Sequence, residues 1–446
     1  MEGSKKMRVT VVGAGYVGLV TGVCFTEIGH EVLIVEKLPE KIALLKKGIS
    51  PIYEPGLEEL LKKHLKDGRL NFTVDLEKGV KFSEIVFICV GTPPSKDGDA
   101  DLSQVEEVSR YIARYMDSYK LIVEKSTVPV NTHKLIKQTL KRYMKNKLFE
   151  FDVASNPEFL REGTAIRDFM EPDRIVIGVE SEKAKKILLE LYEPINCPKL
   201  VVDPATAEII KHAANSFLAM KISFINMVAD LCEKTGADVK LVAEGIGLDK
   251  RIGKSFLNAG IGYGGSCFPK DVKAFISIGE KYGLDFSLLK EVEKINQKRS
   301  YKIIDFLKKA LWTLIDKKIA VWGLAFKPDT DDVREAPSLK IIPKLVEEGA
   351  IVRVYDPKAM KNFKRLFLDL TNITYVEEKY EALKEAEALV ILTEWEEFKT
   401  ADLRKIKELL NLPIVIDGRN LYEPEVMEAF GFEYYPIGRR KIVEYF

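Results

Sequence analysis

A glycine-rich stretch near the N-terminus, "VTVVGAGYVG", narrows the possible folds of this chain more than any other segment. The short apolar run from Met7 to Val12 predicts a buried parallel strand. Gly13, Gly15 and Gly18 then form the spacing G-x-G-x-x-G, and the apolar residues that follow predict a helix to about Gly29. We therefore expect a strand, a tight turn and a helix here, and neither a signal peptide nor a membrane span.

Each glycine of this turn has a physical role in binding a dinucleotide. The first permits the tight turn, the second lets the backbone approach a pyrophosphate, and the third allows close packing of helix on strand. Glu36 ends the next predicted strand, where its carboxylate would accept hydrogen bonds from ribose hydroxyls and repel a 2′-phosphate. This predicts NAD over NADP, although Lys37 and Lys41 weaken the preference, and a glycine turn without a ligand is the alternative.

Strands alternate with helices in two regions of the chain, and the segment between them is helical. Such alternation predicts doubly wound parallel sheets with ligands at the carboxyl ends of the strands. We expect an α/β fold with two Rossmann-like doubly wound domains joined by a long central helix and a helical middle domain. The predicted strands are 7–12, 31–36, 85–91, 121–127, 151–157, 317–326, 350–356, 388–394 and 413–420, and the predicted domains are 1–205, 206–311 and 312–446.

Composition narrows the function classes. The 446 residues include 69 Lys or Arg and 68 Asp or Glu, a net charge of +1, which argues against a broad surface for nucleic acid or an anionic membrane. The five cysteines are far apart in the sequence and form no C-x-x-C pair. This predicts reduced thiols in a cytoplasmic protein, with no disulfide framework and no metal site.

Three pairs of polar residues are candidates for chemistry because each pair is spaced by four residues. On a helix, such a pair shares one face and points at the same space. Each pair also has a simpler explanation, as a solvated helical face or a polar stripe on an apolar helix. The pairs are Glu158 with Glu162, Lys211 with Asn215, and Cys267 with Asp271.

Cys267 lies in the unusual stretch "GGSCFPKD". Pro269 suits the first turn of a helix, so Cys267 is expected at or just before a helix N-terminus, where the helix dipole favours a thiolate. Gly264 and Gly265 are expected to leave room for a ligand against the backbone. A buried cysteine acting as a small hydrophobic residue is the alternative.

Over nearly its whole length the chain resembles the UDP-glucose/GDP-mannose dehydrogenase family. The matching motifs, in the order of the family, are "GAGYVG", "CVGTPP", "EKSTVP", "NPEFLREG", "KHAANSFLAMKISFIN", "RIGKSFLNAGIGYGGSCFPKD", "GLAFKPDTDDVREAPS" and "DGRN". The resemblance, greatest to the branch acting on UDP-glucose, implies two successive NAD-linked oxidations at C6 of the hexose, giving UDP-glucuronate. One departure is Glu36, where the family often has aspartate; its longer side chain keeps the sign of the charge.

The resemblance also implies roles for individual residues. Cys267 would attack an aldehyde to form a thiohemiacetal, whose oxidation gives a thioester that water hydrolyses. Lys211 and Asn215 would stabilise the developing oxyanion. Protons and waters would be handled by Asp271, Glu158, Glu162 and Thr127, with Glu162 and Asp271 as the expected bases.

The implied binding residues form two sets, and the active site is expected in the cleft between the two α/β domains. Arg251 is expected to reach the site of a neighbouring subunit, which implies a homodimer. The implied NAD contacts are Gly13, Gly15, Tyr16, Val17, Gly18, Glu36, Lys41, Val90, Gly91, Thr92, Pro93, Thr127, Glu162, Lys270 and Arg334. The implied sugar-nucleotide contacts are Phe159, Leu160, Arg161, Glu162, Lys211, Asn215, Arg251, Phe256, Asn258, Gly262, Tyr263, Gly264, Lys327 and Arg419.

Three alternatives stay open at the level of the sequence. The same chemistry could act on GDP-mannose or a UDP-N-acetylhexosamine, because base and sugar choice depend on the shape of the pocket. A single-step β-hydroxyacid dehydrogenase shares the N-terminal domain and a helix-borne lysine, but should lack the Cys267 motif and the C-terminal domain. A nucleotide sensor without catalysis would need no nucleophile, which disfavours it.

Overall fold

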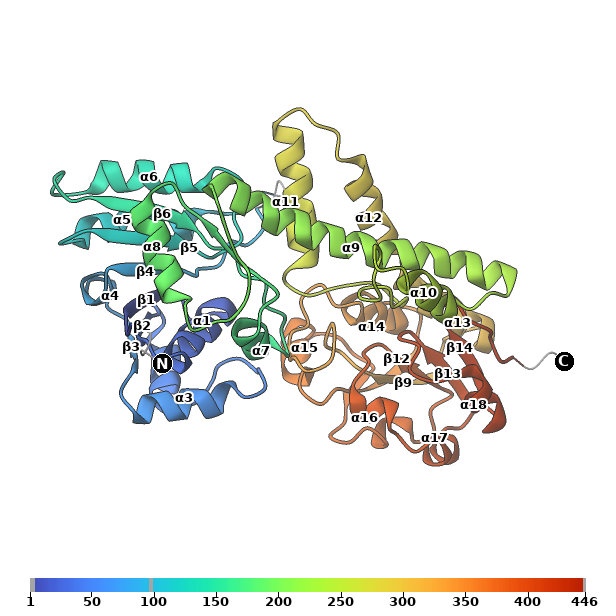
Figure 1. Ribbon diagram of the computed structural model, residues 1–446. Coiled ribbons are helices and arrows are strands. Elements are labelled where there is room, and N and C mark those ends of the chain that lie inside the picture. Colours follow the sequence, from blue (N-terminus) through green and yellow to red (C-terminus); the bar gives the residue numbers. More distant parts are fainter. Residues whose placement is uncertain (1–4, 96–98, 444–446) are drawn as a thin grey trace. The chain divides into compact units, whose positions relative to one another are not determined.

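The computed structural model describes residues 5–95 and 99–443, and the chain forms two compact units (Figure 1). The first unit contains the residues up to Ala214 together with Lys273–Gly283, and the second contains Asn215–Val272 and the residues from Leu284 onward. Two of the three changes of unit fall inside helices, α9 (Pro204–Thr235) and α11 (Phe268–Lys281), and the third follows the end of α11. Within the described residues, no helix is both long and apolar enough to cross a membrane.

The first unit is built on an eight-stranded sheet with the order β3-β2-β1-β4-β5-β6-β7-β8. Its strands pair in parallel except at one junction, where Ser155 of β6 pairs with Gly178 of β7 in antiparallel fashion. The strands are β1 (Arg8–Val12), β2 (Glu31–Val35), β3 (Leu70–Thr73), β4 (Ile85–Ile88), β5 (Lys120–Glu124), β6 (Phe151–Ser155), β7 (Ile175–Gly178) and β8 (Lys199–Val202).

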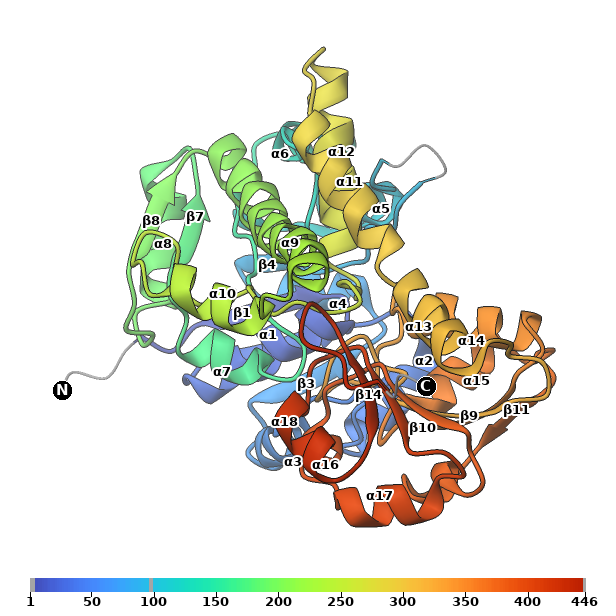
Figure 2. The same cartoon turned by 90° about the vertical axis from the view of Figure 1, so that its right-hand side faces the viewer.

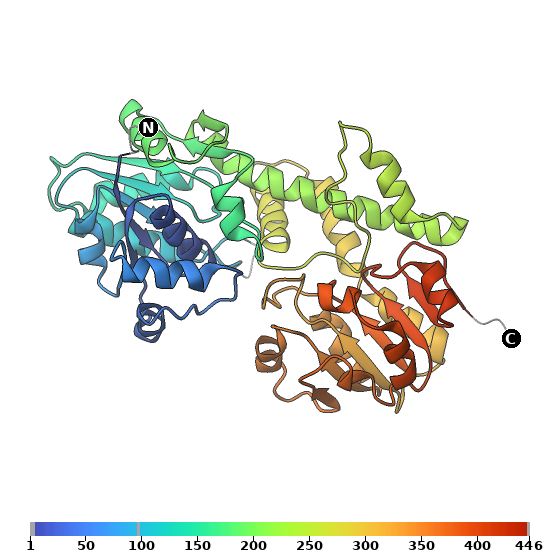
Figure 3. The same cartoon turned by 60° about the horizontal axis from the view of Figure 1, so that its bottom comes forward.

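Helices cover both faces of this sheet, and a separate apolar core lies on each face. Helices α1, α3, α7 and α8 contribute to one core, and α5 and α6 contribute to the other, as Figures 1 and 3 show with α1 and α3 in blue and α5 and α6 in teal. The helices are α1 (Tyr16–Glu27), α2 (Pro39–Lys46), α3 (Leu57–Lys66), α4 (Leu76–Phe82), α5 (Ser103–Tyr115), α6 (Thr132–Tyr143), α7 (Ala165–Met170) and α8 (Glu182–Leu191).

The second unit contains a six-stranded, wholly parallel sheet with the order β11-β10-β9-β12-β13-β14 (Figure 2, orange and red). The strands are β9 (Lys318–Trp322), β10 (Ile351–Tyr355), β11 (Ile373–Tyr375), β12 (Ala388–Ile391), β13 (Ile414–Asp417) and β14 (Glu433–Pro436). The helices are α10 (Val239–Gly247), α12 (Ser287–Lys298), α13 (Tyr301–Leu311), α14 (Ser338–Glu347), α15 (Met360–Leu366), α16 (Glu396–Lys399), α17 (Leu403–Leu409) and α18 (Pro424–Ala429), with a 3-10 turn η1 (Glu381–Leu383).

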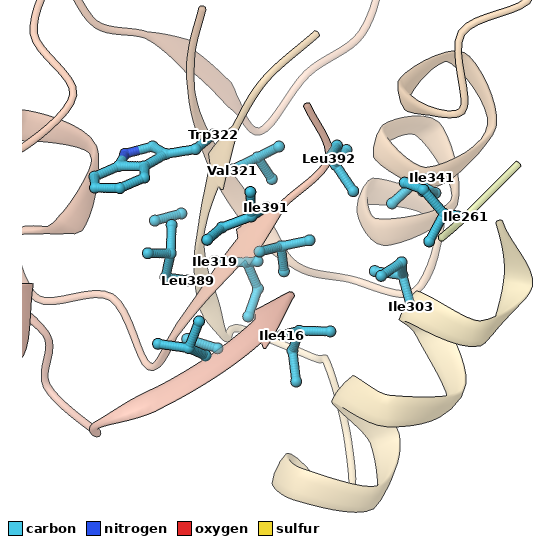
Figure 4. Close-up of a cluster of buried hydrophobic side chains, with 14 of the residues drawn as sticks. Ile261, Ile303, Ile319, Val321, Trp322, Ile341, Leu389, Ile391, Leu392 and Ile416 are labelled. Atoms are coloured by element: carbon cyan, nitrogen blue, oxygen red, sulfur yellow. The ribbon is translucent and has the colours of Figure 1, made fainter. Parts of the chain in front are cut away.

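The core of the second unit explains why these short apolar runs form strands (Figure 4). Ile319 and Val321 of β9 are fully buried, as are Leu389 and Ile391 of β12. Burying such a side chain contributes roughly 1.5–3 kcal/mol, and β-branched side chains fit a pleated surface. Ile303 of α13 joins the same cluster, so the sheet and its covering helix share one core.

The predicted α/β fold with two doubly wound sheets and a long central helix is confirmed. Every predicted strand is present, but most of them end one to four residues earlier than predicted, because their carboxyl ends leave the sheet as loops. Five strands were not predicted from the sequence: β3, β7, β8, β11 and β14. They are three or four residues long, and most of them lie at sheet edges, where the apolar pattern is weak.

Candidate active site and nucleotide sites

The glycine turn of the first unit has the geometry that its sequence predicted. Gly13 has φ +105° and donates its N–H to the carbonyl oxygen of Val35 over 2.8 Å. A Cβ atom at Gly13 would lie 2.4 Å from the carbonyl oxygen of Cys89, and one at Gly18 only 1.9 Å from that of Gly13. These two glycines therefore let the helix and the strand approach closely.

Gly15 differs, because a Cβ atom there would meet nothing within 4 Å. Helix α1 begins at the next residue, and no side chain caps its N-terminus. An open backbone beside an uncapped helix start suits a pyrophosphate, so these residues fit a dinucleotide. When bound there, NAD supplies the acceptor for a hydride.

Glu36 lies at the end of β2, beside this turn, and is buried. Its carboxylate accepts hydrogen bonds from the N–H of Ala14 over 3.1 Å and of Leu38 over 3.2 Å. Lys41 Nζ lies 3.3 Å from the same carboxylate, so the cation that weakens the expected preference for NAD is paired with Glu36 itself. The geometry therefore places the Glu36 carboxylate, with Lys41 beside it, next to the turn predicted to bind the dinucleotide.

The segments predicted to contact NAD after β4 and β5 are held together by side-chain hydrogen bonds. Thr92 Oγ1 donates to the carbonyl oxygen of Thr127 over 2.8 Å, and Ser126 Oγ donates to that of Val90 over 2.8 Å. Since β4 and β5 are adjacent and parallel, both segments leave the same edge of the sheet as the glycine turn.

Lys211 of α9 is buried against the segment after β6. Its Nζ donates to the carbonyl oxygen of Glu158 over 2.6 Å and lies 3.2 Å from the carboxylate Oε1 of the same residue. Lys211 Nζ also lies 5.4 Å from the centre of the Phe159 ring, and Arg174 stacks on this ring at 3.6 Å. The structure therefore brings Lys211, Glu158 and Phe159 together.

Glu158 and Glu162 do not share a helix face, contrary to one reading of their spacing. Residues 156–161 have no regular secondary structure, and the turn that follows leads into α7. Glu158 instead accepts a hydrogen bond from the N–H of Leu160 over 2.6 Å, a local turn that follows Pro157. Both carboxylates are nevertheless buried in the first unit, where a solvated helical face would leave them exposed.

Two buried ionisable residues of the first unit, Lys125 and Glu124, were not predicted from the sequence. Burial lowers the pKa of Lys125 to about 8, and its Nζ donates to Asn156 Oδ1 over 3.0 Å. Burial raises the pKa of Glu124 to about 8, and one of its oxygens accepts from the N–H of Ser126 over 2.8 Å. Both residues lie within the motif "EKSTVP", yet only a structure reveals that they are fully enclosed.

Cys267 directly precedes α11, as Pro269 predicted. The N–H of Asp271 donates to the carbonyl oxygen of Cys267 over 2.8 Å, which places the carboxylate one turn along the helix. Asn215 Nδ2 donates to Asp271 Oδ2 over 2.6 Å. Among the described residues Asp271 Oδ1 has no hydrogen-bond donor, although Lys270 Nζ lies 3.8 Å away, so this buried oxygen is able to accept a proton or orient a water.

The glycines before Cys267 do not leave room for a ligand, and this expectation was wrong. A Cβ atom at Gly264 would lie 2.4 Å from the carbonyl oxygen of Glu335, and one at Gly265 would lie 2.7 Å from the Phe326 ring. The N–H of Gly265 donates to the carbonyl oxygen of Arg334 over 2.8 Å. The glycines instead let the Cys267 loop pack against residues 326–336 of the same unit.

Arg419 lies at the carboxyl end of β13 and contacts the loop predicted to bind the sugar nucleotide. Its Nη1 donates to the carbonyl oxygen of Gly262 over 3.0 Å, and its Nε donates to that of Leu392 over 2.9 Å. Its Nη2 is buried and finds no acceptor in the described part of the chain. Arg419 is thus held by the protein through Nη1 and Nε, and the N–H groups of Nη2 remain for another acceptor.

The other predicted contacts of the second unit lie in several of its loops, and they differ in exposure. Arg251 and Arg334 are mainly exposed, and each forms a bidentate ion pair two residues away, with Asp249 and Asp332. Lys327 Nζ lies 5.5 Å from the Phe326 ring centre. Phe256 and Tyr263 pack their rings against Phe268, and Asn258 is exposed.

The predicted catalytic residues are divided between the two units. Thr127, Glu158, Glu162 and Lys211 belong to the first unit, and Asn215, Cys267 and Asp271 belong to the second. Lys211 and Asn215 both lie on α9, so their spacing of four residues places them on one face of that helix. Lys211 and Asn215 belong to different units, but a single helix sets their relative position.

The histidine next to Lys211 has a structural role. Among the described residues, no three His, Cys, Asp or Glu side chains are grouped so that they could hold a metal ion. His212, one residue after Lys211, is buried; its Nε2 lies 2.8 Å from the carbonyl oxygen of Val128, and its ring stacks on Phe275. It therefore supports the Thr127 loop, a role that the sequence did not predict.

The glycine turn, the two doubly wound units and the cysteine at a helix start are together typical of a dinucleotide-binding α/β protein. Family models match residues 7–196 as the NAD binding domain, 205–298 as the central domain and 320–424 as the UDP binding domain of the UDP-glucose/GDP-mannose dehydrogenase family. The chain belongs to this family and is an NAD-dependent dehydrogenase.

Three relatives illustrate the similarity. A Bacillus subtilis protein named UDP-glucose 6-dehydrogenase TuaD is 48% identical over 97% of this chain and 93% of its own length. The structure of a UDP-glucose dehydrogenase from Pyrobaculum islandicum matches with a TM-score of 0.91 at 40% identity, covering 99% of both chains. The structure of a UDP-D-ManNAc dehydrogenase from Pyrococcus horikoshii matches with a TM-score of 0.86 at 31% identity, covering 97% and 99%.

Proposed function

We propose that this protein oxidises UDP-glucose at C6 to UDP-glucuronate, using NAD twice and a covalent intermediate on Cys267. The observation that carries the proposal is the arrangement of Cys267 directly before α11, with Asp271 one turn later and hydrogen-bonded to Asn215. The names of the relatives supply the sugar nucleotide, because the more similar ones are named for UDP-glucose.

The chemistry requires a nucleophile because an aldehyde cannot lose a second hydride until something adds to it. The C6 alcohol first loses a hydride to NAD and a proton to a base, which gives the aldehyde. The thiolate of Cys267 adds to C6 to form a thiohemiacetal, and this loses a second hydride and a proton to give a thioester. Water then breaks the carbon–sulfur bond, releasing the carboxylate and restoring the thiol.

Lys211 and Asn215 are proposed to stabilise the oxygen of C6 as it becomes an oxyanion. An ammonium and an amide on one face of α9 suit this task, because both are donors that developing charge attracts. Glu162 and Asp271 are the proposed bases, and Glu158 and Thr127 would hold waters. The Asp271 oxygen without a donor among the described residues supports the choice of Asp271.

Each of the three predicted regions has a proposed task. Residues 1–205 would bind NAD, 206–311 would form the subunit interface, and 312–446 would bind the UDP portion. Support for the last comes from Arg419, whose buried Nη2 has no acceptor among the described residues and would suit a diphosphate oxygen or a uracil carbonyl. Lys327, at the carboxyl edge of the second sheet, would add a second cation.

We further propose that two copies of the chain associate through the second unit. Its helices expose a stripe of apolar side chains and border a groove of about 540 Å³ lined almost wholly by apolar atoms. Exposed apolar surface of this kind marks interfaces. The stripe consists of Phe217, Phe224, Met227, Leu231, Leu241, Leu248, Ile252 and Leu288, and the exposed Arg251 lines the same groove, as expected if it reaches a neighbouring site.

The cytoplasm is the proposed location. The thiols of Cys24, Cys89 and Cys232 are buried, and these residues form no disulfide among the described residues. A reducing compartment would also preserve the reactive thiol that the mechanism needs at Cys267.

A panel of sugar nucleotides tests the substrate, and a cysteine variant tests the chemistry. UDP-glucose should give a higher kcat/KM than UDP-N-acetylmannosamine or GDP-mannose. The variant Cys267→Ala should form no UDP-glucuronate, whereas Cys197→Ser, which changes another partly exposed cysteine, should behave as the wild type. Faster turnover of another sugar nucleotide would overturn the substrate, and acid formation by Cys267→Ala would overturn the nucleophile.

A further inference from the structure

A buried carboxylate outside all of the predicted motifs joins two functional segments of the first unit. Glu54 lies in the loop between α2 and α3 and is only 5% exposed. Its Oε2 accepts hydrogen bonds from the N–H of Gly163 over 2.7 Å and from the hydroxyl of Tyr16 over 3.0 Å. Its Oε1 accepts from the N–H of Ala165 over 2.8 Å.

The three donors come from the two places where the cofactor and the reacting groups are expected. Tyr16 is the first residue of α1 and directly follows the open Gly15. Gly163 directly follows Glu162 and has φ +90°, and Ala165 begins α7. One carboxylate therefore holds the start of the dinucleotide helix and the end of the Glu158–Glu162 segment at the same time.

The environment of the Tyr16 hydroxyl is buried and negatively charged. Burial raises the pKa of the Tyr16 phenol far above its ordinary value, and the negative charges of Glu54, Glu162 and Glu158 raise it further. The hydroxyl therefore stays protonated and acts as a donor, which is what a hydrogen bond to Glu54 needs. Tyr16 lies within electrostatic range of both carboxylates of the proposed catalytic segment.

We propose that Glu54 is a positioning residue that couples the NAD site to the Glu158–Glu162 segment through Tyr16. The inference rests on the proposed function, because it takes Glu158 and Glu162 to act on the substrate. A dinucleotide bound against Gly15 restrains the first turn of α1. The hydrogen bond from Tyr16 then restrains Glu54, and Glu54 in turn restrains the two amides that follow Glu162.

The geometry makes this coupling effective because the carboxylate has little freedom. Charge-assisted hydrogen bonds to a buried carboxylate are short and strong, and a group with three donors cannot move toward one without loosening another. Binding energy from NAD is thereby available to order the carboxylates of the Glu158–Glu162 segment.

Hydrogen–deuterium exchange tests the coupling without any substrate. The reporter is the peptide spanning residues 156–170, measured with and without NADH at saturation for each variant. NADH should slow exchange in this peptide in the wild type, and this protection should vanish in Tyr16→Phe, which removes only the linking hydroxyl. Tyr119→Phe is the matched control: its hydroxyl donates to Asp152 over 2.7 Å at the amino ends of β5 and β6, and protection should persist.

Protection that persists in Tyr16→Phe would overturn the proposal. So would a complete loss of NADH binding in that variant, since Tyr16 would then be a binding group. A proposed function that proves wrong would appear differently, as a wild type that shows the NADH-dependent protection but does not oxidise UDP-glucose.

Steady-state kinetics supplies a second test that does not depend on exchange. Glu54→Gln places an amide N–H₂ group where an acceptor is needed, so kcat should fall at least ~10-fold because the segment after Glu162 loses its restraint. The double variant with Tyr16→Phe should show no further loss of kcat, because both changes break one path. Additive losses, or an effect of Glu54→Gln confined to thermal stability, would contradict coupling.

Discussion

The two sheets begin with nearly the same turn, yet only one of these turns is shaped to receive a dinucleotide. Gly13 after β1 and Gly323 after β9 have φ values of +105° and +100°. Each donates its N–H over 2.8 Å to the end of the neighbouring strand, to Val35 and Tyr355 respectively. The strand orders of the two sheets also correspond over six strands.

The turns differ at the next positions. In the first unit, Gly15 is open and Glu36 accepts two backbone hydrogen bonds and the ion pair with Lys41. In the second unit, Ala325 stands where Gly15 would be, and Asp356 accepts five hydrogen bonds. Its donors are the N–H groups of Leu324, Ala325, Lys358 and Ala359 and the indole of Trp395.

This difference shows how one turn serves two purposes. A fully bonded, buried Asp356 has no capacity left for a ribose, and a side chain at 325 occupies the approach that a pyrophosphate would use. The second turn therefore stabilises its unit, and a nucleotide bound there must be held by other groups, of which Arg419 is the strongest candidate.

The largest expected effect breaks the second turn. Asp356→Asn should lower the free energy of unfolding of the second unit by roughly 3 kcal/mol or more, because several buried donors lose their acceptor. Glu36→Gln should cost only about 1 kcal/mol, since fewer donors depend on it. Urea denaturation of both variants checks this, and equal losses would remove the distinction between the turns.

A substitution at Gly15 should weaken cofactor binding without lowering the stability of the fold. Gly15→Ala should raise the Kd for NADH at least ~10-fold, about 1.4 kcal/mol, because the new methyl group occupies the approach of the pyrophosphate. The melting temperature should hardly change, as the methyl meets no protein atom. Ala325→Gly, at the corresponding position of the second turn, should leave the Kd unchanged; fluorescence titration with NADH measures both.

One pH effect should come from Glu124, the buried carboxyl at the end of β5 in the first unit. Burial raises the pKa of Glu124 from its ordinary 4.5 to about 8, so between these pH values the native state keeps a proton that the unfolded state releases. Stability should therefore fall as pH rises through this window. Glu124→Gln should flatten this part of the profile, measured by urea denaturation at several pH values.

Two further variants serve as controls for the effect of Glu124→Gln on the pH dependence of stability. The exposed Glu106→Gln should leave the slope as it is. Asp417, at the matching strand end of the second unit, accepts from Tyr434, Leu421 and Tyr422, so Asp417→Asn should destabilise at every pH. An unchanged slope in Glu124→Gln would show that Glu124 is not the titrating group.

The smallest expected effect concerns the choice of cofactor. Glu36→Gln removes the charge that would repel a 2′-phosphate, while Lys41 remains nearby, so the preference for NAD over NADP should fall by about tenfold. The ratio of kcat/KM for the two cofactors measures this. A ratio equal to that of the wild type would mean that Glu36 does not face the ribose.

The sequence predicts those parts of the molecule whose cause is local. The strand–turn–helix around Gly13 and the helix start after Cys267 follow from glycine and proline chemistry within a few residues. The contact of Glu54 with Gly163 joins residues 109 apart, and no local pattern signals it. The expected space for a ligand at Gly264 and Gly265 was wrong for the same reason, because the residues that fill this space belong to a distant segment.

If the Cys267 thiol carries one sugar through both oxidations, NADH and product must form in a fixed ratio. The most direct test is the stoichiometry of NADH and product when a limiting amount of UDP-glucose is consumed by the wild-type protein. We expect about two NADH and one UDP-glucuronate per sugar, as the thioester route requires. One NADH per sugar, with the free aldehyde accumulating, would contradict it.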